Sequence, residues 1–291
     1  MARLSAYFLP MPQTFYGGQA VIEGVMMRGP SAAAVAVRNR QGTIVVRRED
    51  LSSPTRRVAS LPFVRGLVQL REMLVLGTRM LLYSAAVQAG TSDQEMPRGV
   101  LVIVMISSLA FALGLFFVLP LLVARGPLPA PVEGVVRLAI FLGYLALIRR
   151  FPRVRRVFQY HGAEHKTINA FEAGAALTPA HVQSFSTAHT RCGTAFLLWV
   201  VVLSAIAFSV VNPPSLVLAI VARIILIPLI AAIGYEMLRL GTRYYGVPAV
   251  RLLVQPSLWL QSLTTAEPDD DQVETAIVAL RAVLADGVSV R

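Results

Sequence analysis

The chain has 291 residues, of which 55% are hydrophobic and only 15% are charged, and its mean hydropathy is +0.63. Soluble globular domains carry about 25% charged residues, so this composition excludes an ordinary soluble protein and indicates a membrane protein. The formal net charge of +11 comes mostly from arginine. Because arginines beside membrane spans are attracted to anionic lipid, the excess predicts membrane lipid as a partner and no specific nucleic acid.

Residues 1–61 predict a small cytosolic β-sheet. An apolar run occupies residues 19–27, and two further strand-like runs, 32–38 and 43–48, are separated by a short polar stretch at 39–42. Apolar runs joined by a short polar turn are typical of a β-hairpin. We therefore expect a sheet of two or three strands.

Residues 62–98 predict an amphipathic helix, strongest between Pro62 and Val87. Charged side chains recur every seven residues on one helical face, at Arg65, Glu72 and Arg79. Another face carries apolar side chains, namely Phe63, Leu67, Leu70, Leu74 and Leu81. Such a helix either lies along the membrane surface or packs under the membrane-spanning helices.

Four later runs are long and apolar enough to cross a bilayer, which requires roughly 20 residues. They are residues 100–123, 132–148, 194–211 and 215–235. The flanking segments are basic, with 12 Lys+Arg against 6 Asp+Glu in residues 1–98 and 7 against 2 in residues 149–193. By the positive-inside rule both basic segments face the cytoplasm. With four crossings, the N- and C-termini would both lie on the cytoplasmic side of a bacterial cell membrane.

The expected fold is therefore a mainly α membrane protein with four transmembrane helices, a small N-terminal β-hairpin or sheet and amphipathic interfacial helices. Its transmembrane domain covers residues 99–238 and includes a cytosolic loop at 149–193; residues 239–291 form an interfacial segment and a C-terminal helix. The acidic stretch 267–271, after Thr264 and Thr265, suits the start of that helix. Its buried stripe is predicted to be Val273, Ile277, Leu280 and Leu284.

All four histidines and the single cysteine fall between residues 161 and 192. In a helix, the pattern His161-x-x-Glu164-His165 would place both imidazoles one turn apart on one face, within reach of one metal ion. Glu164 would lie beside them as a general base. An ion held by two histidines needs at least one more protein ligand, which either His189 or Cys192 could provide. These nitrogen and sulfur ligands predict zinc or another divalent transition metal.

Other residues near this cluster have two interpretations each. Glu172 would lie about 10 Å beyond His165 along a helix, so a salt bridge or a supporting contact to Arg191 competes with metal ligation. Cys192 is either a nucleophile activated by its basic neighbours or a buried structural thiol. For His181, a solvated or helix-start position is favoured over a role at the site.

Three charged residues outside the cluster also require an explanation. Glu23 interrupts an apolar run, so it either faces solvent or points into the site as a catalytic residue, and Arg28 could pair with it. Arg223 lies inside the fourth apolar run, where an unpaired charge is costly. It requires a partner such as Glu133, unless it extends to the outer membrane surface.

Four blocks of the sequence resemble the bacterial YqhQ family. They are Tyr16-Gly-Gly-Gln-Ala-Val-Ile-Glu-Gly-Val-Met-Met-Arg-Gly-Pro30, Tyr160-His-Gly-Ala-Glu-His-Lys-Thr167, His189-Thr-Arg-Cys-Gly-Thr194 and Leu258-Trp-Leu-Gln-Ser-Leu-Thr-Thr265. The family is a group of uncharacterised multi-pass membrane proteins described as predicted metal-dependent enzymes. The resemblance implies no established reaction, and it implies six candidate site residues: Glu23, His161, Glu164, His165, His189 and Cys192.

These patterns favour a metal-dependent hydrolase at the cytosolic membrane surface. Glu164 would act as the base toward water, and Arg191 and Arg28 could stabilise a developing oxyanion. The main alternative is a non-catalytic factor for membrane-protein insertion or assembly, with a structural His/Cys cluster and a membrane-protein or translocation partner. A transporter is a third alternative that would require an oligomer, because four spans form a thin pathway.

Overall fold

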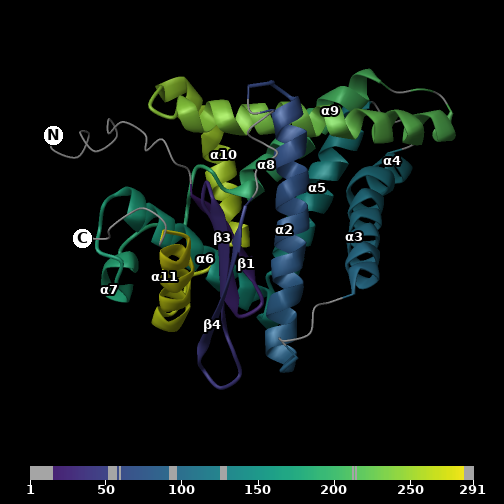
Figure 1. The fold of residues 1–291 in the computed structure, drawn as a ribbon. Coiled ribbons are helices and arrows are strands. Elements are labelled where there is room, and N and C mark those ends of the chain that lie inside the picture. The colour runs from purple at the N-terminus through teal and green to yellow at the C-terminus, as the bar shows by residue number, and fades with distance from the viewer. Residues whose placement is uncertain are drawn as a thin grey trace.

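The computed structural model describes residues 16–51, 58, 60–91, 97–124, 130–211, 213 and 215–284. The chain is mostly helical, with a small N-terminal sheet, as the sequence predicts. The helices of the described residues are α2 (Val64–Ala89), α3 (Arg98–Leu113), a π-helix (Gly114–Val118), α4 (Leu119–Val123), α5 (Ala130–Ile148), α6 (Pro152–Glu172), α7 (Pro179–Val182), α8 (Gly193–Val210), α9 (Leu216–Arg243), α10 (Pro248–Thr264) and α11 (Asp270–Leu284). In Figure 1, α9 runs crosswise to α2 along the top of the molecule.

The sheet has four antiparallel strands in the order β1-β2-β3-β4, rather than the two or three expected. They are β1 (Gly17–Val21), β2 (Gly24–Arg28), β3 (Ala32–Arg38) and β4 (Ile44–Asp50). The β3–β4 hairpin is confirmed, and its turn is held by Asn39, whose Oδ1 accepts from the backbone N–H groups of Gln41 and Thr43. The additional strand arises because the first apolar run turns back on itself at Ile22 and Glu23. Glu23 takes a left-handed backbone conformation there (φ 53°).

Helices cover both faces of this sheet. On one face, Val25 and Met27 of β2 pack with α6 and α11; on the other, Met26 of β2 and Val35 of β3 pack with Met80 of α2. Figure 1 shows the sheet between α11 and α2. Because β3 is buried on both sides, its sequence is an unbroken apolar run instead of an alternating one.

Helix α2 is confirmed, and each of its three regularly spaced charges pairs with a different element. Glu72 accepts from Arg28 of β2 at 2.8 Å, Arg79 donates to Glu49 of β4 at 3.0 Å, and Arg65 donates to Glu236 of α9. The charged face therefore binds α2 to the sheet and to α9. This arrangement favours the packed position of α2 over one along the membrane surface.

Within the described residues, three helical segments are long and apolar enough to cross a membrane: Val102–Val123, Gly193–Val210 and Leu216–Arg243. The fourth expected span, now α5, is not among them. Its early turns carry two buried charges, Glu133 and Arg137. The structure thus supports three candidate spans. That both termini lie in the cytoplasm, which depended on an even number of crossings, stays a prediction.

A buried charge cluster joins these helices. Glu133 of α5 accepts hydrogen bonds from Arg137 of α5 and Arg223 of α9, each at 2.5 Å. Glu133 is thereby confirmed as the partner of Arg223. Arg137 also donates to Ser204 of α8 and, at 2.9 Å, to the carbonyl of Phe116 in the π-helix. The cluster therefore ties four helical segments together inside apolar surroundings.

The C-terminal helix begins at Asp270, whereas Thr264 ends the preceding helix α10. Asp269 Oδ1 accepts from the N–H of Gln272 at 2.8 Å, and the Gln272 side chain accepts from the Asp269 N–H at 3.0 Å. This reciprocal capping satisfies two helix-terminal donors. The predicted stripe of Val273, Ile277, Leu280 and Leu284 is buried, as expected.

Candidate metal centre

Helix α6 brings the two histidines of the His-x-x-Glu-His pattern together. It begins with Pro152, whose missing N–H is harmless in a first turn, and continues unbroken to Glu172. His161 and His165 are one turn apart, and the centres of their rings lie 4.4 Å from each other. His165 is almost fully buried, whereas His161 is partly exposed.

The Nδ1 atom of each histidine faces a backbone carbonyl. His161 Nδ1 lies 2.8 Å from the carbonyl oxygen of Thr264, and His165 Nδ1 lies 2.5 Å from that of Thr187. A carbonyl can only accept, so both Nδ1 atoms carry a proton; in a neutral imidazole this leaves the lone pair on Nε2. Metal-binding histidines are commonly oriented in this way. Among the described residues, the buried Nε2 of His165 has no hydrogen-bond partner.

Cys192 completes the group from the start of α8. Its Sγ atom lies 3.3 Å from His161 Nε2 and accepts from the N–H of Thr194 at 3.4 Å, which caps the helix. One ligand atom from each of His161, His165 and Cys192 lies within 4.8 Å of the others. Two imidazoles and a thiolate suit zinc and related transition metals. Three protein ligands would also leave a fourth position of a tetrahedral site open.

Glu164 lies beside this group as a buried carboxyl. The backbone N–H of Gly18 in β1 hydrogen-bonds to it, while its Oε2 has no hydrogen-bond partner among the described residues. Burial raises the pKa of Glu164 above its ordinary value, and the nearby His161 and His189 partly oppose that shift. The close approach of β1 to Glu164 requires glycine at position 18, because a Cβ atom there would lie 3.0 Å from Glu164 Cδ and 2.5 Å from the Met26 carbonyl oxygen.

His189 takes a different position from the other candidate ligands. The side chain of Gln261 in α10 accepts a hydrogen bond from the His189 backbone N–H at 2.8 Å and donates one to the His189 carbonyl at 2.9 Å. The Nε2 atom of His189 lies 3.5 Å from Glu172 Oε2. Glu172 also pairs with Arg191, one of the two arrangements that the sequence suggested. Burial lowers the pKa of His189 to about 4, so the ring is neutral near pH 7. Of the two alternatives for a third ligand, the geometry favours Cys192.

The remaining candidates lie outside the group. Glu23 accepts from Arg156 Nε at 2.5 Å and contacts the Tyr160 hydroxyl, and Arg28 pairs with Glu72 instead of Glu23. His181 is exposed and lies 2.8 Å from the Thr178 hydroxyl, in line with the solvated position expected for it. The catalytic roles expected for Glu23 and Arg191 therefore stay predictions.

The comparisons with known proteins agree with the resemblance seen in the sequence. Residues 61–286 match a family model described as "Protein of unknown function (DUF1385)". The chain belongs to this family. It is also 33% identical, over 92% of each chain, to a Bacillus subtilis (strain 168) protein named "Uncharacterized protein YqhQ". No solved structure matches the chain.

The DUF1385 match covers α6, α8 and α10, which supply the three possible ligands and the carbonyl of Thr264. It begins after Gly18, the residue that holds Glu164. Sequence reasoning missed Gly18, Thr187, Gln261 and Thr264 as parts of the site. Backbone donors and acceptors have no signature in residue type, although Gln261 and Thr264 lie in one of the blocks that resemble the YqhQ family.

Proposed function

We propose that this chain is a membrane-associated, metal-dependent hydrolase, with zinc or a similar divalent ion held by His161, His165 and Cys192. The observation that carries the proposal is the pair of Nδ1–carbonyl contacts, which leave both Nε2 atoms available, while one ligand atom of each histidine lies within 4.8 Å of the Cys192 sulfur. The unpartnered, buried Nε2 of His165 fits a ligand better than a structural histidine.

A bound zinc ion would supply a Lewis acid that polarises a substrate carbonyl or phosphoryl oxygen. Glu164 would accept the proton of the attacking water. Its raised pKa suits that role, because a general base works best when its pKa lies near the working pH. Arg191, fixed by Glu172, carries a positive charge two residues from His189 and could stabilise developing negative charge.

Metal analysis of the purified full-length protein tests the ligand set. We expect about one equivalent of metal in the wild type and a large loss in both His161→Ala and Cys192→Ser. The matched control is His181→Ala, since this histidine is exposed and outside the group. Equal metal content in all four proteins would refute the proposal.

Glu164→Gln tests the catalytic step separately. The variant should keep its metal and lose hydrolysis of whichever ester, phosphodiester or peptide the wild type cleaves. The alternative function, insertion or assembly of membrane proteins, predicts co-purification with ribosomes or a translocon that Glu164→Gln leaves undiminished. Arg223 gives this alternative less support than the sequence suggested, because Arg223 pairs with Glu133 inside the protein.

A further inference from the structure

The corner between α5 and α6 carries a cluster of exposed cations, Arg150, Arg153 and Arg155, which we call the arginine ridge. Within the part of the chain that the structure describes, their guanidinium groups make no ion pair or hydrogen bond. The arginines on either side differ from them. Arg149 donates to the carbonyl of Ser262, and Arg156 pairs with Glu23.

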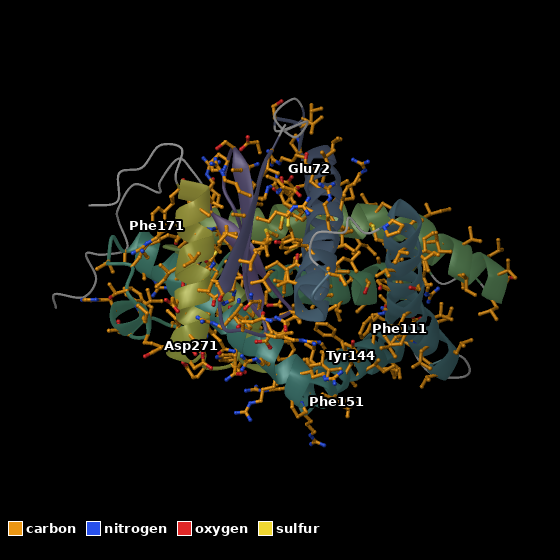
Figure 2. All side chains as sticks on the ribbon, turned by 60° about the horizontal axis from the view of Figure 1, so that its bottom comes forward. Glu72, Phe111, Tyr144, Phe151, Phe171 and Asp271 are labelled. Carbon is orange, nitrogen blue, oxygen red and sulfur yellow. The ribbon has the colours of Figure 1, made fainter. Side chains whose placement is uncertain are left out.

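Exposed apolar side chains lie next to the arginine ridge in the sequence. Leu147, near the end of α5, is 54% exposed, and Phe151, within the ridge, is 55% exposed. Figure 2 shows Phe151 at the outer edge of the molecule, near projecting side chains tipped with nitrogen. On α10, Trp259 is 67% exposed and lies one turn before Ser262, which contacts Arg149.

We propose that the arginine ridge binds the phosphate groups of anionic phospholipids, with Phe151 at the boundary between headgroups and acyl chains. Arginine binds phosphate through paired N–H donors. The order from aliphatic to aromatic to basic side chains is typical of a helix end that lies at the membrane interface. RNA also presents phosphates, and its bases could stack on Phe151, but it offers no apolar surface for the exposed Leu147 as acyl chains do.

The ridge is independent of the proposed hydrolase function. Together, however, the two sites restrict where a substrate could be bound. His161 follows Arg153 by eight residues on α6, which is about 12 Å at 1.5 Å per residue. The metal ligands would thus lie about 12 Å along α6 from the ridge-bound phosphates.

Native mass spectrometry of the full-length protein in detergent tests the ridge, with added phosphatidylglycerol or phosphatidylcholine as the probe. We expect the wild type to retain phosphatidylglycerol preferentially. An arginine near a membrane surface contributes about 1 kcal/mol, or roughly fivefold, so Arg153→Gln/Arg155→Gln should lower the preference by up to about 25-fold. The control Arg40→Gln/Arg71→Gln removes two exposed charges elsewhere and should keep it.

Equal retention of the two lipids by the wild type would overturn the proposal, as would equal losses in the two double variants. It would also be overturned if the ridge variant lost binding of a short RNA and kept its lipid preference. Metal content is measured on the same samples. The ridge variant should keep its metal and His161→Ala should keep its lipid preference, so failure of one proposal can be told from failure of the other.

Discussion

Replacing Glu133 with glutamine should destabilise the protein more than any other single change in the buried charge cluster. One carboxylate serves two cations: Glu133 Oε1 accepts from Arg137 and its Oε2 accepts from Arg223. The two arginines are only 1% and 2% exposed. Glu133→Gln therefore leaves two buried positive charges without the carboxylate, whereas Arg223→Met leaves a balanced pair of Glu133 and Arg137.

Removing one partner of a buried ion pair costs about 3–5 kcal/mol. For a chain of roughly this size, each kcal/mol lowers the melting temperature by about 2–4 °C, so Glu133→Gln should lower it by at least roughly 6 °C. Arg223→Met should cost less than half as much. The double variant Glu133→Gln/Arg223→Met should recover part of the loss, because only one cation then lacks a counter-charge.

Size-exclusion chromatography of the detergent-solubilised protein after heating provides the measurement. The melting temperature is taken where half of the monodisperse peak remains. The reasoning is wrong if Glu133→Gln melts within about 2 °C of the wild type, or if Arg223→Met is the more damaging single change.

Phe208, Gly18 and His165 each allow a further test. Phe208→Leu should destabilise the protein by about 1–2 kcal/mol, because the guanidinium carbons of Arg137 and Arg223 lie within 4.8 Å of the Phe208 ring centre. An unchanged melting temperature in the same assay would exclude a cation–π contribution. Gly18→Ala should lower the free energy of unfolding by about 1–3 kcal/mol through the close contact with Glu164, and should leave the metal content unchanged. Gly17→Ala is the control, because an added Cβ there meets nothing within 4 Å and should not change the melting temperature. Equal changes in melting temperature for the two variants would contradict this reasoning. Burial lowers the pKa of His165, so its neutral form contributes stability above about pH 6.5, and that contribution is lost only as the pH falls toward the depressed folded pKa. The melting temperature in the same assay should therefore change little from about pH 8 to 6.5 and fall at lower pH, and an equal fall across both ranges would contradict this reasoning.

Local patterns in the sequence determined the parts of the site that lie on one element. His161 and His165 are separated by one helical turn, so the 3.6-residue period alone predicted their shared face. The pairing of Arg223 with Glu133 was also predictable, because an unpaired charge in an apolar helix costs too much to persist. The first apolar run, by contrast, contains no Asn-Gly or Pro-Gly signal at Ile22 and Glu23, so its turn and the fourth strand could not be read from residue types.

Only the tertiary structure favours Cys192 over His189 as the third ligand of the proposed metal site. They are three residues apart, and the choice depends on how Gln261 of α10 holds the His189 backbone while Cys192 caps the start of α8. The contact of Gly18 with Glu164 likewise requires β1 to pack against α6, across more than a hundred residues of chain. Helical periodicity acts over a few residues, whereas a site assembled from distant segments depends on how their helices and strands pack, which residue spacing does not encode.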